Sequence, residues 1–303
     1  MNVHPMAGVY AAAVTPVKYD YSPDYEALPT LLDFLARRGC HGALILGTTG
    51  EGPSFTAEER EQIWQSALEV RDEHREFRLF AGTGTPSLDE TIGLTKTAFD
   101  LGYDGVVVLP PYYFHKASEE GLFTWFCEVI ARGVPRNGLV MGYHFPQVSG
   151  VRLSLELLMR LKDTFPGEFK GIKDSSGKLK YAQGLVSTMG EDFLTLVGND
   201  RIFSKALELG VDGCITALAN LQSPDLRIIW DSHLAGNIDE QAQGHVNVGR
   251  EIIERYPQVA PAIKTLLNGL HDIPMWEVRP PLMPLDEEDV QRALREMMRA
   301  SIR

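Results

Sequence analysis

The feature that most constrains the fold is an alternation of short apolar runs with longer helical patterns across the first two-thirds of the chain. Parallel strands that are buried on both faces read as short continuous apolar runs, and helical patterns between them indicate strand–helix units. Eight such units are what a (β/α)8 barrel requires, whereas open doubly wound sheets have about five to seven strands. The sequence therefore predicts an α/β fold, a (β/α)8 TIM barrel, with strands at residues 9–15, 43–46, 78–81, 105–109, 139–143, 169–173, 194–197 and 213–217.

Helix starts are marked between several of these runs. Thr56 with Glu59 and Ser87 with Glu90 match the capping box, and Ser118 precedes two glutamates suited to a first helical turn. These signals predict that helices follow the strands where a barrel needs them.

The alternation stops near residue 220. The patterns at 224–234, 239–255, 259–267 and 286–298 predict helices. We therefore expect two regions, a (β/α)8 barrel over residues 1–222 and a helical appendage over residues 223–303.

Charge and hydropathy narrow the classes of partner. The net charge of -12 disfavours nucleic acid and anionic lipid, which need a basic footprint. No run of about 18 apolar residues indicates a membrane span. The apolar residues 6–14 lack the basic leader of a secretory signal, so they predict the first strand. Small molecules and other proteins remain as partners.

The cysteines predict a reducing compartment. Cys40, Cys127 and Cys214 are odd in number and form no CxxC pair. We expect reduced thiols in the core and a cytoplasmic protein.

Chemistry in such a barrel lies at the carboxyl ends of the strands. The residues there include Lys173, Tyr143, Tyr113 and the hydroxyls of the turn GTTGEG at 47–52. A metal-dependent aldolase would need two or three histidine or carboxylate ligands. The two histidines near strand ends form no HxH or HxxxH pair, so we expect neither a metal nor a cofactor.

A lysine at the end of an apolar strand offers another route to a carbanion. Burial favours the neutral amine of a lysine, which attacks a ketone to give a protonated Schiff base. The simpler alternative is a structural ion pair between Lys173 and Asp174 or another carboxylate. Tyr143 can move protons if a second hydroxyl such as Thr48 relays them, and the turn at 47–52 offers backbone N–H groups to a carboxylate.

Five motifs in this order resemble one family. GTTGE, PPYY, the Gly-Tyr-x-x-Pro of GYHFP, GIKDSSG and the Gly-x-x-Gly-x-Ile of GVDGCI resemble the dihydrodipicolinate synthase and N-acetylneuraminate lyase superfamily of class I pyruvate-type aldolases. The resemblance covers essentially the whole chain.

The resemblance implies a role for each matching residue. Lys173 would form the Schiff base with a 2-keto acid, and Tyr143 would be the proton shuttle. Thr48 would link Tyr143 to Tyr113, which the family donates across a dimer interface within a homotetramer, a dimer of dimers. Thr48 and Thr49 would hold the carboxylate. The further residues expected to bind substrate are Gly47, His144, Ser175, Gly198, Asn199 and Ile215, the last through its carbonyl.

Departures from the family pattern bear on the substrate. Val148 stands where the synthases carry an arginine that grips the second substrate's carboxylate, and valine offers no such clamp. His144 replaces the usual asparagine, and it either contacts substrate hydroxyls or packs behind the site. These changes suggest a different partner aldehyde.

The expected activity is that of a class I aldolase, a carbon–carbon lyase. It would cleave a 2-keto-3-deoxy sugar acid or 4-hydroxy-2-oxoglutarate reversibly to pyruvate and an aldehyde. The alternatives are a dehydratase that uses the same Schiff base, a dihydrodipicolinate synthase, and a barrel that binds a keto acid without catalysis.

Overall fold

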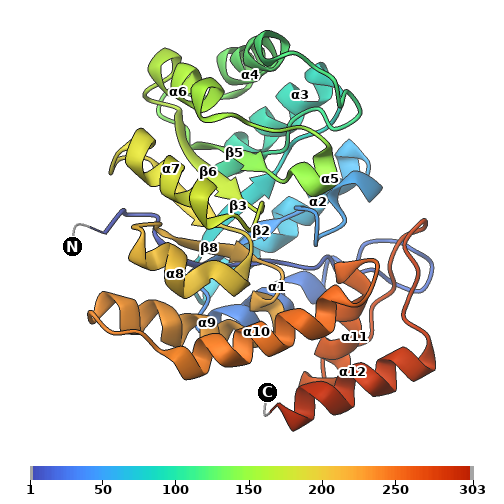
Figure 1. The fold of residues 1–303 in the computed structure, drawn as a ribbon. Helices are drawn as coiled ribbons and strands as arrows, with labels where there is room; N and C mark the ends of the chain where they lie inside the picture. Colours follow the sequence, from blue (N-terminus) through green and yellow to red (C-terminus); the bar gives the residue numbers. More distant parts are fainter. Residues whose placement is uncertain (1–2, 301–303) are drawn as a thin grey trace. The chain divides into compact units, whose positions relative to one another are not determined.

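The computed structural model describes residues 3–300. Its parallel strands form a closed barrel in chain order, which confirms the predicted (β/α)8 fold class; Figure 1 shows the elements coloured along the chain. The strands are β1 (Gly8–Ala12), β2 (Gly42–Ile45), β3 (Arg78–Gly82), β4 (Gly105–Val108), β5 (Val140–His144), β6 (Phe169–Asp174), β7 (Leu194–Val197) and β8 (Gly213–Thr216).

Each predicted apolar run overlaps one of these strands, but four runs extend past the end of the strand, whereas β3, β5 and β6 each continue one residue past the run. The run at 9–15 is a strand only to Ala12, and after it the Val14 N–H donates to Asn220 Oδ1 at 3.2 Å and the Thr15 hydroxyl to the Gly50 carbonyl at 2.7 Å. The runs at 105–109 and 213–217 each end one residue late. Apolar residues continue past some strand ends, and β5 and β6 end on the polar residues His144 and Asp174, so hydropathy alone does not mark the last strand residue.

Helices separate the strands as predicted. At Thr56 both hydrogen bonds of the capping box are present, and the hydroxyls of Ser87 and Ser118 accept from backbone N–H groups of the first turn. The helices between strands are α1 (Ala27–Arg37), α2 (Ala57–Leu68), α3 (Leu88–Asp100), α4 (Glu119–Gly133), α5 (Pro146–Ser149), α6 (Leu155–Thr164), α7 (Leu179–Met189) and α8 (Phe203–Glu208), with short 3-10 turns η1 (Gly52–Ser54), η2 (Glu69–Asp72) and η3 (Asp200–Ile202).

The chain divides into two compact units. The first comprises the described residues up to Gly8 together with Arg78–Cys214. In it α3 packs against α4, α4 against α6, α6 against α7, and α7 against α8, outside strands whose residues are almost all buried. This arrangement leaves the carboxyl ends of β5, β6 and β7 to carry polar residues.

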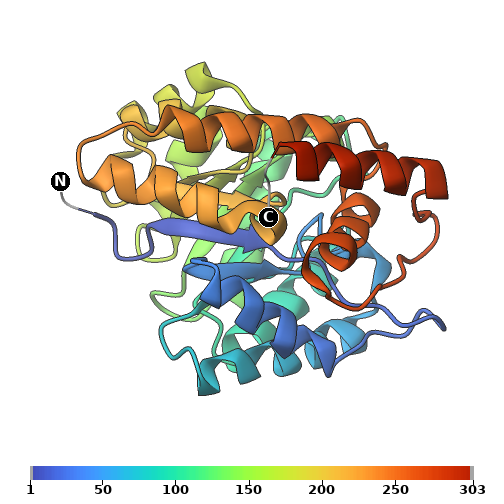
Figure 2. The same ribbon diagram turned by 90° about the horizontal axis from the view of Figure 1, so that it is seen from below.

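The second unit comprises Val9–Phe77 and the described residues from Ile215 onward. It holds α9 (Ala219–Leu234), α10 (Glu240–Glu254), α11 (Val259–His271) and α12 (Glu287–Arg299). Helix α10 lies alongside α9, and α12 packs against both α10 and α11 (Figures 1 and 2). The predicted helical appendage is therefore present. The division of the chain at residue 222 stays a prediction.

Two of the predicted C-terminal helices differ from the structure by more than one residue at one end. The helix predicted at 224–234 begins at Ala219, with a kink at Gln222 where the backbone leaves helical geometry. Pro224 follows that kink, and proline tolerates only the first turn of a helix, which explains why the sequence pattern placed the start there. Helix α11 continues to His271, four residues past its predicted end.

The cysteines are free, as expected, but only two of them are buried. Cys40 and Cys214 lie in the core, and burial raises the pKa of the Cys40 thiol to about 12. Cys127 on α4 is half-buried, so the prediction of a core position was wrong for this residue. Within residues 3–300, no helix combines the length and hydropathy needed to cross a membrane.

Candidate active site

Strands β5 and β6 bring the two principal candidates together. Tyr143 is the register partner of Lys173, and His144 is the partner of Asp174. The register shifts between Val140 and Met141, so that Lys170 has no partner on β5. An unshifted register would place Lys173 opposite His144, and the bulge instead sets it opposite Tyr143.

The Lys173 side chain lies against the face of the Tyr143 ring. Its Nζ atom is 4.2 Å from the ring centroid, and both residues are buried, at 3% and 5% exposure. In the described part of the chain no carboxylate forms an ion pair with Lys173. The alternative of a structural ion pair therefore lacks support in this structure, and the buried amine retains the environment that nucleophilic lysines need.

Asp174 faces away from Lys173, as neighbouring strand residues do. Its carboxylate accepts from the backbone N–H of Ser176 at 2.9 Å and from the Ser176 hydroxyl at 3.1 Å. Burial raises the pKa of Asp174 to about 6. The carboxylate thus shapes the turn that follows Lys173 instead of neutralising the amine.

Ser175 and Gly198 border the lysine side chain. The Ser175 N–H donates to the His144 carbonyl at 2.8 Å, and the Gly198 N–H donates to the Asp174 carbonyl at 2.7 Å. A Cβ atom at Gly198 would lie 1.9 Å from the Ser175 hydroxyl oxygen and 3.3 Å from Lys173 Cε. Only glycine fits there without moving both neighbours, so Gly198 and Ser175 lie beside the Lys173 side chain.

His144 is fixed as a neutral imidazole. Its ring stacks on Tyr181 with centroids 4.3 Å apart, and its Nδ1 accepts from the Leu153 N–H at 3.1 Å. Burial, with the nearby positive charges of Arg152 and Lys178, lowers the pKa of His144 to about 4. The neutral ring therefore carries its proton on Nε2 as a single donor. Sequence reasoning missed Tyr181, which lies in a helix 37 residues on without any motif to mark it.

Three other residues of the same unit have distinct surroundings. Asn199 is half-buried and its Oδ1 accepts from the Arg201 N–H at 3.1 Å, which caps η3. Tyr113 is 77% exposed, with its ring edge-on to Phe114 at 5.5 Å. Val148 is 53% exposed on α5.

The remaining candidates belong to the second unit. In the turn at 47–52, the Gly47 carbonyl accepts from the Gly52 N–H at 3.1 Å and the Thr48 carbonyl accepts from the Glu51 N–H at 3.2 Å. Thr48 is exposed, whereas Thr49 is 8% exposed. Ile215 is fully buried on β8. The threonines thus occupy a tightly hydrogen-bonded turn.

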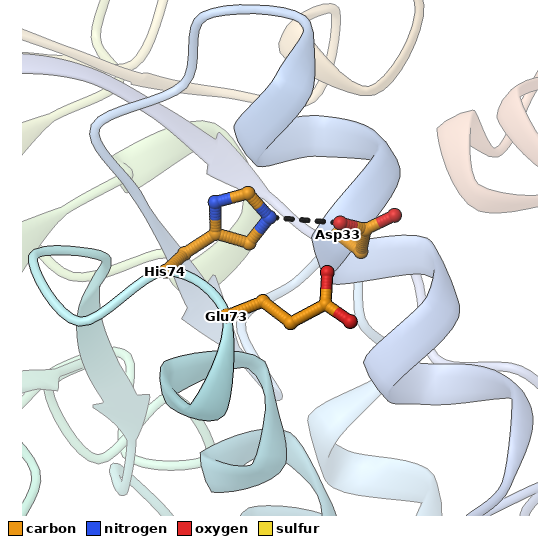
Figure 3. Close-up of side chains that lie close together, drawn as sticks. All are labelled: Asp33, Glu73 and His74. Atoms are coloured by element: carbon orange, nitrogen blue, oxygen red, sulfur yellow. Dashed lines mark hydrogen bonds and ion pairs between the residues drawn. The ribbon is translucent and has the colours of Figure 1, made fainter.

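One group of side chains in the described range has the composition of a metal site. Asp33 on α1 lies beside Glu73 and His74, and ligand atoms of the three fall within 4.8 Å of one another (Figure 3). His74 Nε2 is 2.8 Å from Asp33 Oδ1, and Arg37 donates to Asp33 at 2.8 Å and to Glu73 at 3.3 Å. The guanidinium of Arg37 already pairs with the carboxylates of Asp33 and Glu73. These side chains therefore form an ion-pair network at the surface.

Comparison with known proteins places this chain in a family. The profile of the Dihydrodipicolinate synthetase family matches residues 5–300. The chain belongs to this family. The family assignment agrees with the resemblance carried by the five motifs, and it makes the chain a member of a group of lyases and synthases on one barrel fold.

Relatives in the family carry two kinds of name. A protein of Chloroflexus aurantiacus, named an uncharacterized DapA-like lyase, is 36% identical over 93% of each chain. A 4-hydroxy-tetrahydrodipicolinate synthase of Oceanobacillus iheyensis is 31% identical, again over 93% of each. Among solved structures, the E. coli K12 prophage protein YagE of the dihydrodipicolinic acid synthase family, in complex with pyruvate, has a TM-score of 0.92 and 26% identity, covering 99% of this chain and 100% of that one.

Proposed function

We propose that this protein is a class I aldolase that cleaves a 2-keto acid reversibly to pyruvate and an aldehyde. The observation that carries the proposal is the buried amine of Lys173, which lies 4.2 Å from the Tyr143 ring centre and has no ion-pair partner in residues 3–300. The likeness to a family protein solved with pyruvate supports a keto acid as the ligand. Candidate substrates are 2-keto-3-deoxy sugar acids and 4-hydroxy-2-oxoglutarate.

The proposed reaction needs no cofactor. The neutral amine of Lys173 attacks the keto carbon, and loss of water gives the iminium ion. Tyr143 takes the proton from the C4 hydroxyl, the C3–C4 bond breaks, and its electrons move into the iminium to leave an enamine. The aldehyde departs, C3 takes up a proton, and water hydrolyses the iminium to release pyruvate and regenerate the amine.

Other residues complete the proposal. Thr48 relays the proton of Tyr143, and Thr48 with Thr49 binds the substrate carboxylate through N–H and hydroxyl groups. His144 shares the strand face of its register partner Asp174 and stacks on Tyr181, so in the proposal it packs behind the site. The further contacts in the proposal are Gly47, Ser175, Gly198, Asn199 and the carbonyl of Ile215.

The proposed assembly is a homotetramer built as a dimer of dimers. Tyr113 exposes 77% of its surface in the single chain, which is large for a tyrosine next to another aromatic ring. In the proposed dimer, the exposed side chain of Tyr113 contacts the active site of a second copy of the chain. The three free cysteines support action in a reducing cytoplasm.

Borohydride trapping tests the proposal. The protein is incubated with pyruvate and reduced, and the added mass is located by peptide mass spectrometry. We expect the adduct on Lys173, its loss in Lys173→Met, and its retention in the matched control Lys170→Met, which removes another lysine from β6. An unmodified Lys173 in folded protein at saturating pyruvate would reject the Schiff-base mechanism.

A second candidate is the dihydrodipicolinate synthase reaction, which the names of several relatives at about one-third identity favour. Against it stands Val148, whose apolar side chain cannot clamp a carboxylate. Product analysis distinguishes the reactions, because an aldolase releases free pyruvate from its keto acid. A dehydratase gives water and a dehydrated keto acid, and a synthase consumes pyruvate.

A further inference from the structure

A buried ion pair links the turn at 47–52 to the C-terminal helices. Glu51 closes the GTTGEG turn, and its Oε1 lies 2.5 Å from Nζ of Lys264 on α11. Both side chains are completely inaccessible to solvent. These two residues are 213 positions apart, so the contact is a tertiary link within the second unit.

Each member of the pair makes a second hydrogen bond. Lys264 Nζ also donates to the Glu277 carbonyl at 2.6 Å, and Glu51 Oε2 accepts from the Arg279 N–H at 3.0 Å. The carboxylate therefore connects the turn to α11 and to the segment around residue 278 at the same time. Such directional bonds fix an orientation that apolar packing would leave less defined.

The backbone at Glu51 and Gly52 is in an unfavourable conformation, which the hydrogen bonds of the Glu51 carboxylate help to maintain. Glu51 has left-handed backbone angles (φ 55°, ψ 28°), which are unfavourable for a residue with a side chain. A Cβ atom at Gly52 would lie 2.2 Å from the Leu46 carbonyl oxygen, so the turn is closely folded on itself. Strained backbone of this kind persists where surrounding contacts hold it in place.

We propose that Glu51 and Lys264 are positioning residues that hold the turn at 47–52 in the orientation in which Thr48 and Thr49 bind the substrate carboxylate. This inference rests on the proposed function. Neither residue touches the substrate. Both act through the backbone of the turn, whose Thr48 carbonyl accepts from the Glu51 N–H.

The test measures pyruvate dependence of borohydride trapping in Glu51→Gln, Lys264→Met and the double variant. We expect the pyruvate concentration for half-maximal trapping to rise by about tenfold or more in all three, with the limiting rate changed by less than about threefold, as for lost binding without lost chemistry. Each single variant should also lower the unfolding temperature, because it leaves one buried charge unpaired.

The double variant separates positioning from stability. Removing both charges abolishes the unpaired charge, so the double variant should recover much of the lost unfolding temperature. It should not recover pyruvate affinity, because the ion pair that joins the turn to α11 is still missing. As a further control, Leu226→Ala on α9 creates a cavity in the core of the same unit and should lower the unfolding temperature without changing half-maximal trapping.

Two results would overturn the inference, and only the second would also overturn the proposed function. If the unmodified protein is trapped and the Glu51 and Lys264 variants show the same pyruvate dependence as Leu226→Ala, the pair is structural and the proposed function stands. If the unmodified protein itself forms no adduct, the proposed function fails and the inference fails with it.

Discussion

The side-chain nitrogen of Lys173 lies 4.2 Å from the centre of the Tyr143 ring, on the face of the ring. The two residues are register partners on adjacent strands, and the Tyr143 ring also stacks on Phe145 with centroids 5.9 Å apart. The ring thus contacts both an amine and a second aromatic side chain. This packing gives Tyr143 two separable contributions, the ring that covers the amine and the phenol that moves protons.

Tyr143→Phe separates these contributions. The ring and its contact with Lys173 remain, so a borohydride adduct with pyruvate should still form. Turnover should fall by about 100-fold or more, because the general acid–base group is lost. The measurement is the rate of pyruvate release from a cleavable keto acid, beside the yield of adduct.

Tyr103→Phe is the matched control for that change. Tyr103 is buried in the same unit and precedes β4, at the opposite end of the strand from the candidate residues. It should leave turnover within about twofold of the unmodified protein, the size of effect typical of substitutions away from a site. Equal turnover in Tyr143→Phe and Tyr103→Phe would remove Tyr143 from the mechanism.

His144 should make stability depend on pH. Its pKa of about 4 in the folded protein is below the value of about 6.5 expected when unfolded. The unfolded state therefore binds more protons between these values, and His144 contributes stability that is present above pH 6.5 and lost as the pH falls toward 4. The contribution is on the order of 3 kcal/mol.

The substitution His144→Asn isolates the contribution of His144 to the pH dependence of the free energy of unfolding. The asparagine oxygen can accept from the Leu153 N–H, and the variant has no imidazole to titrate. Burial raises the pKa values of Asp174 and Asp212 to about 6, so these carboxyls act in the opposite sense, with stability lost as the pH rises from 4 to 6. The free energy of unfolding should be measured for both proteins between pH 4 and pH 7. The difference between them should shrink as the pH falls, and a constant difference would contradict the assignment.

Much of the fold could be predicted from sequence because its signals are local. Runs such as 105–109, with valine at three successive positions, read as buried parallel strands, and Thr56 with Glu59 marked a helix start that the structure reproduces. The strand ends were less predictable, since apolar residues such as Ala13 and Val14 remain buried after β1 has ended. Burial continues past the strand, so hydropathy does not mark its last residue.

The arrangement of the site was only partly predictable. Tyr143 and Lys173 could be assigned to neighbouring strands, but the bulge at Lys170 that sets them opposite each other leaves no signal in hydropathy. The partner of Glu51 was not predicted either, because an ion pair over 213 residues depends on tertiary packing. Local patterns identify which residues reach the strand ends, and long-range contacts decide how they are oriented.

Metal removal should leave the activity unchanged. The group of Asp33, Glu73 and His74 is already occupied by Arg37, and the pKa of Asp33 is held below its usual range, first by the hydrogen bond from His74 and then by Arg37. Dialysis against a chelator should therefore change neither the rate of pyruvate release nor the unfolding temperature. Loss of activity that zinc or magnesium restores would favour a metal-dependent aldolase over the Schiff-base mechanism.

Val148→Arg should change the preference for the aldehyde half. Val148 is 53% exposed on the short helix α5, so an arginine fits there with a change in stability within about 0.5 kcal/mol. The guanidinium can bind a carboxylate through two hydrogen bonds. In the condensation direction with pyruvate, the KM for an aldehyde that carries a carboxylate should fall by about tenfold, equivalent to about 1.4 kcal/mol. The KM for glyceraldehyde, which has no carboxylate, should stay the same. Val148→Gln, a polar side chain without charge, is the control, and a fall in KM with glutamine as large as that with arginine would show that position 148 does not act by binding a carboxylate.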